Sequence, residues 1–135
     1  MRFVICGDFS PKGSGSYFDF TSDALTCEML AGKAENALDD IKEELEKSDL
    51  NIVNVETSLA LEGVGIEKNG PVLVDHPAWA DYLKRQGFTV GLLANNHTGD
   101  IGPEGTVNTI RVLKNAGLQV VGAGKDEESS GETLF

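Results

Sequence analysis

One stretch of the chain decides the fold, and it reads Val90-Gly91-Leu92-Leu93-Ala94-Asn95-Asn96-His97-Thr98-Gly99-Asp100-Ile101-Gly102-Pro103-Glu104-Gly105. An apolar run of strand length ends in amide, imidazole and hydroxyl side chains, and Pro103 stands where a helix prefers to begin. The pattern predicts a strand, a polar loop and a helix. Ligands of open α/β sheets bind beyond the carboxyl ends of the strands, so Asn96 and His97 would lie where chemistry is placed. An Asn-rich turn that only caps the next helix would explain the same residues.

The rest of the chain repeats this alternation of strands and helices. Apolar runs predict four strands, at Phe3–Cys6, Leu50–Val55, Thr89–Ala94 and Leu118–Val121. Helical spacing of apolar residues predicts three helices, at Ala34–Lys47, Pro77–Gly87 and Pro103–Ala116, with Gly87 and Gly117 as left-handed caps. The sequence therefore predicts an α/β fold with a mainly parallel sheet and flanking helices.

Two long connections interrupt the alternation. Phe9–Gly32 begins directly after Asp8, and we expect it to form a loop that could wall or cover the crevice. Leu59–Asp75 is expected to be a second loop, with a short extended piece near Val72. His76 precedes a helix-starting proline, which favours a capping or packing role over a ligand role.

Composition bounds the class of protein. The 135 residues, 40% of them hydrophobic, suffice for a single domain spanning residues 1–135. Eleven basic and 22 acidic residues give a formal charge of -11, which disfavours nucleic acid and anionic membrane as partners. The chain as given has no signal-like or membrane-spanning apolar run, which predicts a cytoplasmic location. Cys6 and Cys27 lack metal-site spacing, and two reduced thiols are expected.

Residues able to bind a hard metal follow three of the four predicted strands. They are Asp8, Glu56 and the pair Asn96 and His97. In neighbouring parallel strands these side chains would point into one crevice, where their oxygen and nitrogen atoms suit Mn²⁺, Mg²⁺ or Zn²⁺, and Glu56 could bridge two ions. The competing interpretation is that acidic and amide residues end strands because they make good turns.

Several motifs resemble those of the bacterial capsule synthesis protein family (CapA, or poly-gamma-glutamate synthesis protein), which is similar to the calcineurin-like metallophosphoesterases. The resemblance runs in order from Arg2 to about Gly124. It is carried by Gly7-Asp8, Asn54-Val55-Glu56-Thr57, Gly87-Phe88, the stretch from Leu93 to Gly102, then Thr109, Leu113, Gly117 and Gly122-Ala123-Gly124.

That resemblance implies roles for individual residues. Asp8, Glu56 and Asn96 would be metal ligands, with Glu56 as the bridging carboxylate. His97 would be a general acid or a phosphate-contacting group, and Asp100 would orient His97 or stabilise the loop. No residues are assigned to an organic cofactor.

Two departures from the family pattern affect these expectations. The wider superfamily has Asp-x-His in its first motif, whereas Asp8 is followed here by Phe9-Ser10, and the chain has only two histidines. The family's second, histidine-bearing half has no counterpart in this sequence. The resemblance therefore implies the N-terminal half of a metallophosphoesterase-like α/β sandwich, with a weakly bound metal and a bare sheet edge that favours self-association.

Two functions from different classes follow. The first is a metal-dependent phosphoesterase-like domain, a hydrolase if a missing second half completes its site, acting on an anionic small molecule or polymer. The second is a non-catalytic assembly component for capsule or poly-gamma-glutamate production. A plain α/β scaffold without a ligand is a third interpretation. Members of the family are often membrane-anchored or exported. The resemblance therefore offers an alternative to the cytoplasmic location that the sequence as given predicts.

Overall fold

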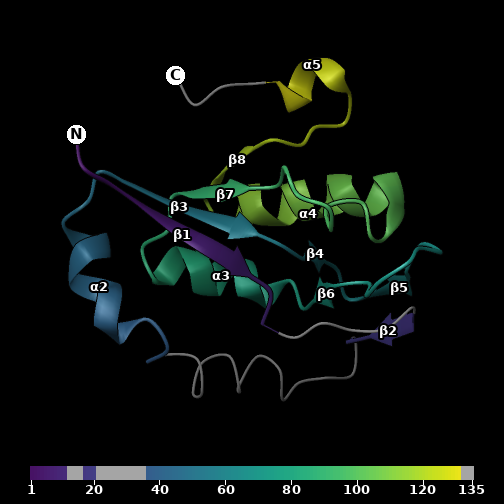
Figure 1. Ribbon diagram of the computed structural model, residues 1–135, viewed down its shortest axis with the longest axis horizontal. Helices are drawn as coiled ribbons and strands as arrows, with labels where there is room; N and C mark the ends of the chain where they lie inside the picture. The colour runs from purple at the N-terminus through teal and green to yellow at the C-terminus, as the bar shows by residue number, and fades with distance from the viewer. Residues whose placement is uncertain (12–16, 21–35, 132–135) are drawn as a thin grey trace.

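The main sheet is parallel throughout. The computed structural model describes residues 1–11, 17–20 and 36–131. Its four-stranded sheet has the order β1 (Phe3–Phe9), β3 (Leu50–Val55), β7 (Val90–Leu92) and β8 (Gln119–Val121). Every neighbouring pair in this sheet is parallel, β7 and β8 included. The predicted α/β class with a parallel sheet and flanking helices is thereby confirmed (Figure 1).

Three helices match the predicted ones, with shifted ends. They are α2 (Asp39–Glu46), α3 (Ala78–Arg85) and α4 (Gly102–Asn115). Figure 1 shows α3 and α4 behind the sheet, on one of its faces. Gly87 and Gly117 have φ angles of 94° and 88°, the left-handed caps that the sequence predicted. A short helix, α5 (Glu127–Ser130), was not predicted, because its polar residues carry no apolar stripe.

The core lies between the sheet and these helices. Val53 and Val55 of β3 are buried against residues that include Leu83 of α3 and Leu113 of α4. Asn51 fixes the nearby turns, because its Nδ2 donates to the carbonyl oxygens of Leu45 and Gly87, each at 2.8 Å. Alternate residues of β3 thus face the helices, as expected of a strand with one face in the core.

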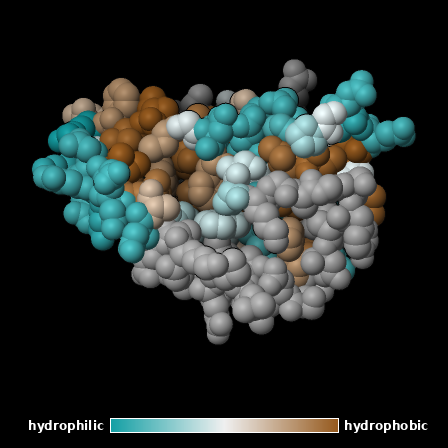
Figure 2. Space-filling view, turned by 60° about the horizontal axis from the view of Figure 1, so that its bottom comes forward, coloured by the Kyte–Doolittle hydropathy of each residue, from teal (hydrophilic) through white to brown (hydrophobic). Residues whose placement is uncertain are grey.

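The opposite face of the sheet is open at β1. Phe3 and Ile5 are 59% and 64% exposed, and β1 has a single hydrogen-bonded neighbour among the described strands. Leu50 and Ile52, their register partners on β3, are only partly buried. Figure 2 shows a hydrophobic area beside the hydrophilic surface of α2, at the end of the molecule where β1 begins. Parallel sheets normally have both faces covered, so this surface is unusual for its class.

The first strand is longer than the sequence predicted. We expected it to end at Gly7-Asp8, but β1 continues to Phe9. The register with β3 shifts between Cys6 and Asp8, which makes Gly7 the extra residue of a β-bulge. Asp8 pairs with Asn54 beyond the bulge, and the Phe9 ring packs edge to face on Trp79 at 5.4 Å between ring centroids. The glycine marks a bulge inside the strand, and the expectation that it ends the strand was wrong.

The second predicted loop contains small sheets. β4 (Ser58–Leu59) and β6 (Val74–Asp75) pair in parallel, and β5 (Glu62–Val64) pairs antiparallel with β2 (Tyr17–Asp19). Strands of two or three residues are too short to give a periodic pattern, so the sequence predicted only the short extended piece near Val72, which overlaps β6 at Val74.

Some expectations concern residues that the structure does not describe. The wall or lid proposed for Phe9–Gly32 lies mostly outside the described residues, and so do Cys27 and the predicted start of the first helix at Ala34. Within the described part of the chain, none of the helices has the length and apolar character needed to cross a bilayer.

Candidate functional site

Three of the predicted site residues lie at the same edge of the sheet. Asp8 lies near the end of β1, Glu56 directly follows β3, and His97 lies in the loop after β7. These three strands are parallel neighbours, so their carboxyl ends face the same side. The Glu56 amide donates to the Phe9 carbonyl oxygen at 3.1 Å, which continues the pairing of β1 and β3 up to the site.

Asp8 and Glu56 form a carboxyl pair. The Asn54 Nδ2 donates to Asp8 Oδ1 at 2.7 Å, and this bond lowers the pKa of Asp8. A hydrogen bond between the Asp8 and Glu56 carboxyl groups lowers the pKa of Asp8 further and raises the pKa of Glu56. The two carboxyl groups therefore influence each other's ionisation.

Asn95 is used to build the loop. Its Oδ1 accepts hydrogen bonds from the His97 amide at 3.0 Å and the Thr98 hydroxyl at 3.2 Å. Its Nδ2 donates to Asn54 Oδ1 at 3.1 Å and to the Val55 carbonyl oxygen at 3.0 Å. The amide is thereby committed to holding the loop against β3.

Asn96, the neighbouring amide, is exposed. Its role as a metal ligand stays a prediction. The alternative that the Asn-rich stretch caps the next helix is not what the structure contains, since α4 has Ile101 as its N-cap and no side-chain cap hydrogen bond.

His97 and Asp100 form a buried pair. His97 Nδ1 lies 2.7 Å from Asp100 Oδ2, and the Asp100 residue is 1% exposed. Lys68 Nζ donates to Asp100 Oδ1 at 2.5 Å, and the Leu73 amide donates to Oδ2 at 2.8 Å. Burial alone would raise the pKa of Asp100, but the hydrogen bonds from Lys68, His97 and Leu73 outweigh it and the pKa is lowered.

The resemblance implied that Asp100 orients His97, and the structure brings these two residues together. Their catalytic roles stay predictions. His76, the other histidine, accepts a hydrogen bond at Nδ1 from the Ala78 amide at 3.0 Å, consistent with the helix-start role that the sequence favoured.

The donor set suits a hard cation only in part. Two adjacent carboxylates with amide oxygens nearby are ligands that Mg²⁺ or Mn²⁺ accepts together with retained waters. Within residues 1–11, 17–20 and 36–131, however, there is no group of three or more His, Cys, Asp and Glu side chains placed to hold a metal ion. The residues present therefore suit a cation that is weakly bound by oxygen ligands. They suit zinc less well, because zinc favours sites with several nitrogen ligands.

Sequence reasoning missed Asn54, Asn95 and Lys68. The two asparagines stand inside motifs that the sequence analysis quoted, so their position after apolar strands was a usable signal. Lys68 gave none, since it lies 29 residues before His97 in a connection without periodicity.

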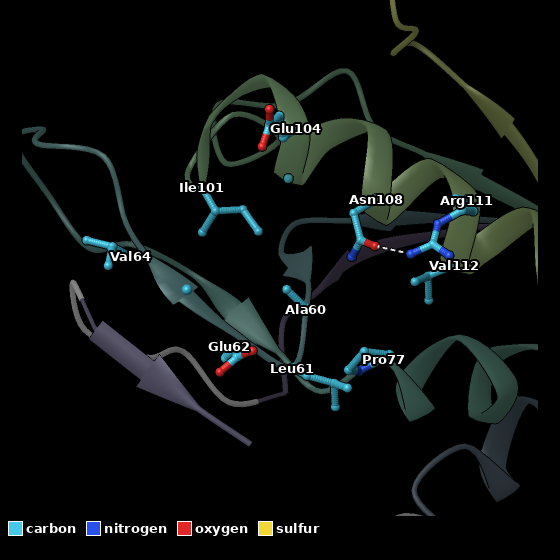
Figure 3. A pocket seen from close by; sticks show the side chains of 12 residues that line it. Ala60, Leu61, Glu62, Val64, Pro77, Ile101, Glu104, Asn108, Arg111 and Val112 are labelled. Atoms are coloured by element: carbon cyan, nitrogen blue, oxygen red, sulfur yellow. Dashed lines mark hydrogen bonds between the residues drawn. The ribbon is translucent and has the colours of Figure 1, made fainter. Parts of the chain in front are cut away.

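A separate cavity of about 600 Å³ lies away from these residues. Figure 3 shows its lining from β5 and α4, where Arg111 contacts Asn108 at 2.6 Å. Neither Asp8, Glu56 nor His97 lines it. This cavity is therefore separate from the candidate site at the carboxyl edge of the sheet.

Comparisons with known proteins identify relatives of this chain. A family profile described as "Bacterial capsule synthesis protein PGA_cap" matches residues 2–135. A "Probable polyglutamine synthesis accessory protein" of Mycobacterium tuberculosis (strain CDC 1551 / Oshkosh) is 34% identical over 79 residues, which are 58% of this chain and 21% of the relative. The "Capsule biosynthesis protein CapA" of Bacillus anthracis is 52% identical over 44 residues, which are 33% of this chain and 11% of the relative.

The aligned regions thus cover about a fifth and about a tenth of these relatives. The family profile, in contrast, covers nearly all of this chain, including both strand-end motifs and the loop that holds His97. The chain therefore belongs to the bacterial capsule synthesis protein (PGA_cap) family.

Proposed function

We propose that this chain is a metal-dependent phosphoesterase-like domain of the capsule synthesis family. The proposal rests on one observation, which is the carboxyl pair of Asp8 and Glu56 at the sheet edge that also carries the buried His97–Asp100 pair. Asp8 is the main cause that raises the pKa of Glu56, and a charge on His97 opposes that rise, so the two pairs lie within electrostatic reach. An acid–base group beside paired carboxylates is the combination that metal-assisted hydrolysis requires.

Asp8 and Glu56 are the residues that would hold the metal ion, with Asn96 as a third oxygen ligand. A cation held there would neutralise negative charge on the two carboxylates. Mn²⁺, Mg²⁺ or Zn²⁺ would supply Lewis-acid chemistry there, acting on a phosphoryl oxygen and on water. With few protein ligands the ion would be weakly held.

His97 would handle the proton of the reaction. Asp100 accepts the hydrogen bond of Nδ1 and fixes the ring, which leaves Nε2 as the nitrogen that can exchange a proton with a leaving oxygen. Asn95 holds the backbone at His97 by accepting a hydrogen bond from the His97 amide. The loop thus orients the histidine before any substrate arrives.

The ligand would be an anionic small molecule or a polymer with anionic groups. The printed names of the relatives refer to capsule biosynthesis and polyglutamine synthesis, and a role in capsule or poly-gamma-glutamate production is part of this proposal. A cation is needed in either case, because the chain carries a formal charge of -11 and would repel an anion.

A non-catalytic assembly component is the second candidate. It is favoured by the lack of a three-residue ligand group in the described part of the chain and by the exposed Phe3 and Ile5 on the open sheet face. Such a component would keep the fold and use its surface rather than its crevice.

Manganese binding and hydrolysis separate the two candidates. Electron paramagnetic resonance of free Mn²⁺ should show weak binding to the wild-type chain, a loss of binding in Glu56→Gln, and no change in Glu67→Gln, an exposed control. Hydrolysis of bis(p-nitrophenyl) phosphate should require Mn²⁺ and fall in His97→Ala. A folded wild-type chain that neither binds Mn²⁺ nor hydrolyses the ester would instead support the assembly component.

A further inference from the structure

Lys68 contacts the His97–Asp100 pair from a distant part of the chain. Its Nζ lies 2.5 Å from Asp100 Oδ1 and 3.4 Å from His97 Nδ1, and its side chain is only 20% exposed. A lysine that is mostly buried normally has a specific partner, and this one is a carboxylate 1% exposed. We propose that Lys68 is a positioning residue, which fixes the His97 ring by holding the Asp100 carboxylate.

The two oxygens of the Asp100 carboxylate accept hydrogen bonds from different donors. Oδ2 accepts from His97 Nδ1 at 2.7 Å and from the Leu73 amide at 2.8 Å, whereas Oδ1 accepts from Lys68. Without Lys68, Oδ1 would be buried with no donor among the described residues. The carboxylate would gain by rotating to satisfy it, and that rotation would move Oδ2 away from the ring.

Lys68 acts through Asp100 and makes no productive bond to the ring itself. Because Asp100 Oδ2 accepts from His97 Nδ1, that nitrogen carries the proton, and an ammonium group has no acceptor to offer it. The 3.4 Å approach of Lys68 Nζ to Nδ1 is therefore a consequence of their shared partner. The arrangement predicts that the ring has its proton on Nδ1 and a bare Nε2.

The connection that carries Lys68 is itself fastened to Asp100. The Ile66 amide donates to the Asp100 carbonyl oxygen at 2.8 Å, and the Leu73 amide binds its side chain. The two ends of residues 65–72 lie against each other, since a Cβ at Gly65 would lie only 2.6 Å from Val72 Cγ1. The lysine is thus presented by a closed segment, as positioning requires.

The competing interpretation is that Lys68 only neutralises a buried charge. Both interpretations predict a loss of stability without Lys68, so stability cannot separate them. The mobility of the His97 ring can, and it is independent of any metal or substrate. This inference deepens the proposed function of His97, but its test would stand if the chain proved not to be a phosphoesterase.

Nuclear magnetic resonance of the imidazole nitrogens provides the test. The chain has two histidines, and their contacts predict opposite tautomers, with the proton on Nδ1 in His97 and on Nε2 in His76. Lys68→Met should speed exchange of the His97 Nδ1 proton with water by at least about tenfold, the factor for losing a hydrogen bond to a charged group. Lys68→Arg should restore slow exchange, and Lys125→Met, at an exposed lysine, should leave it unchanged.

Two results would overturn the proposal. One is unchanged exchange in a folded Lys68→Met chain, and the other is a His97 ring that already has its proton on Nε2 in the wild type. If Lys68→Met fails to fold, Lys68→Ser replaces it, because serine is polar but too short to reach Asp100 Oδ1. Faster exchange in Lys68→Ser than in Lys68→Arg supports the proposal, and equal exchange in the two contradicts it.

Discussion

Asn54 donates a hydrogen bond from Nδ2 to Asp8 Oδ1 at 2.7 Å, although 46 residues separate the two in sequence. They are register partners on β3 and β1, so the bond lies across the strand pair just before the carboxyl edge of the sheet. The Asn54 Oδ1 in turn accepts from Asn95 Nδ2, which follows β7. One side chain thereby connects the ends of three strands and sets where the Asp8 carboxylate stands.

The first prediction concerns the roles of Glu56 and His97 in metal binding. Excess Mn²⁺ should raise the melting temperature of the wild-type chain only at high concentration, following mass action for a weak site. Glu56→Gln should abolish the rise because it removes a charge from the carboxyl pair, whereas His97→Ala should largely keep it. Differential scanning fluorimetry with a metal titration measures this. The reverse order of effects would show that the roles are assigned wrongly.

The second prediction concerns the stability that Asp100 provides. Asp100→Asn should lower the free energy of unfolding at pH 7 by about 3 kcal/mol, since it removes one partner of a buried charge pair and leaves Lys68 without its anion. Urea unfolding measures the difference. Asp81→Asn, at an exposed aspartate, should change the free energy by less than about 0.5 kcal/mol. A similar loss in both variants would count against a special role for Asp100.

The third prediction follows from the lowered pKa of Asp100. A carboxyl group whose pKa is lower in the folded state stabilises the fold above its unfolded-state pKa of about 3.9. That contribution is lost as the pH falls through the lower folded-state pKa. Between pH 5 and pH 2 the wild type should therefore lose more unfolding free energy than Asp100→Asn, as measured by urea unfolding at each pH. Parallel curves for the two proteins would refute the assignment.

The fourth prediction concerns Gly122, which follows β8 with a φ angle of 86°. A Cβ at this position would lie 2.6 Å from Ala94 Cβ and 2.9 Å from the Ala94 backbone nitrogen. Gly70 has a φ angle of 104° but open space around it, so Gly70→Ala measures backbone strain alone. Gly122→Ala should cost about 2 kcal/mol more in urea unfolding than Gly70→Ala, because overpacking adds to the strain. Equal costs would mean that the backbone at Ala94 moves aside freely.

The fifth prediction is self-association through the open face. Phe3 and Ile5 are exposed on an edge strand of the main sheet, and we expect copies of the chain to associate there. Sedimentation velocity should show association that increases with concentration and weakens in a Phe3→Ser, Ile5→Thr double variant. Val107→Thr, which changes an exposed valine on α4, should leave it unaltered. A wild-type monomer at every concentration would rule this expectation out.

The sequence predicted the sheet and its helices because their apolar residues form runs or recur at regular spacing, and such patterns indicate which residues are buried. The strand near Val90, the helix after Pro103 and the cap at Gly117 were all visible as local patterns. The short strands β4 and β5 were not, because two or three residues cannot show a period. Their pairing depends on partners far along the chain, such as Ser58 with Val74.

The site was predictable where its residues follow strands. Asp8, Glu56 and His97 could be placed at one edge from the alternation alone, and their pairing with Asn54 and Asn95 then depends on register. Lys68 could not be found in this way, because only the folded path of residues 65–73 brings it to Asp100. A contact that depends on tertiary geometry leaves no trace in local periodicity.

The bulge at Gly7 changes which residues of β1 face the core, from even-numbered residues before it to an odd-numbered residue after it. Before it, even-numbered residues such as Val4 and Cys6 pack against the core, and after it Phe9 does so, while Asp8 stands opposite Asn54. If Gly7 instead took a regular place in the ladder, Asp8 and Phe9 would swap sides, and a carboxylate would face the helices. Replacing Gly7 by alanine keeps the residue count, and a Cβ there meets nothing within 4 Å. What residue 7 contributes is therefore its place outside the ladder, which directs Phe9 to the core and leaves Asp8 on the other face.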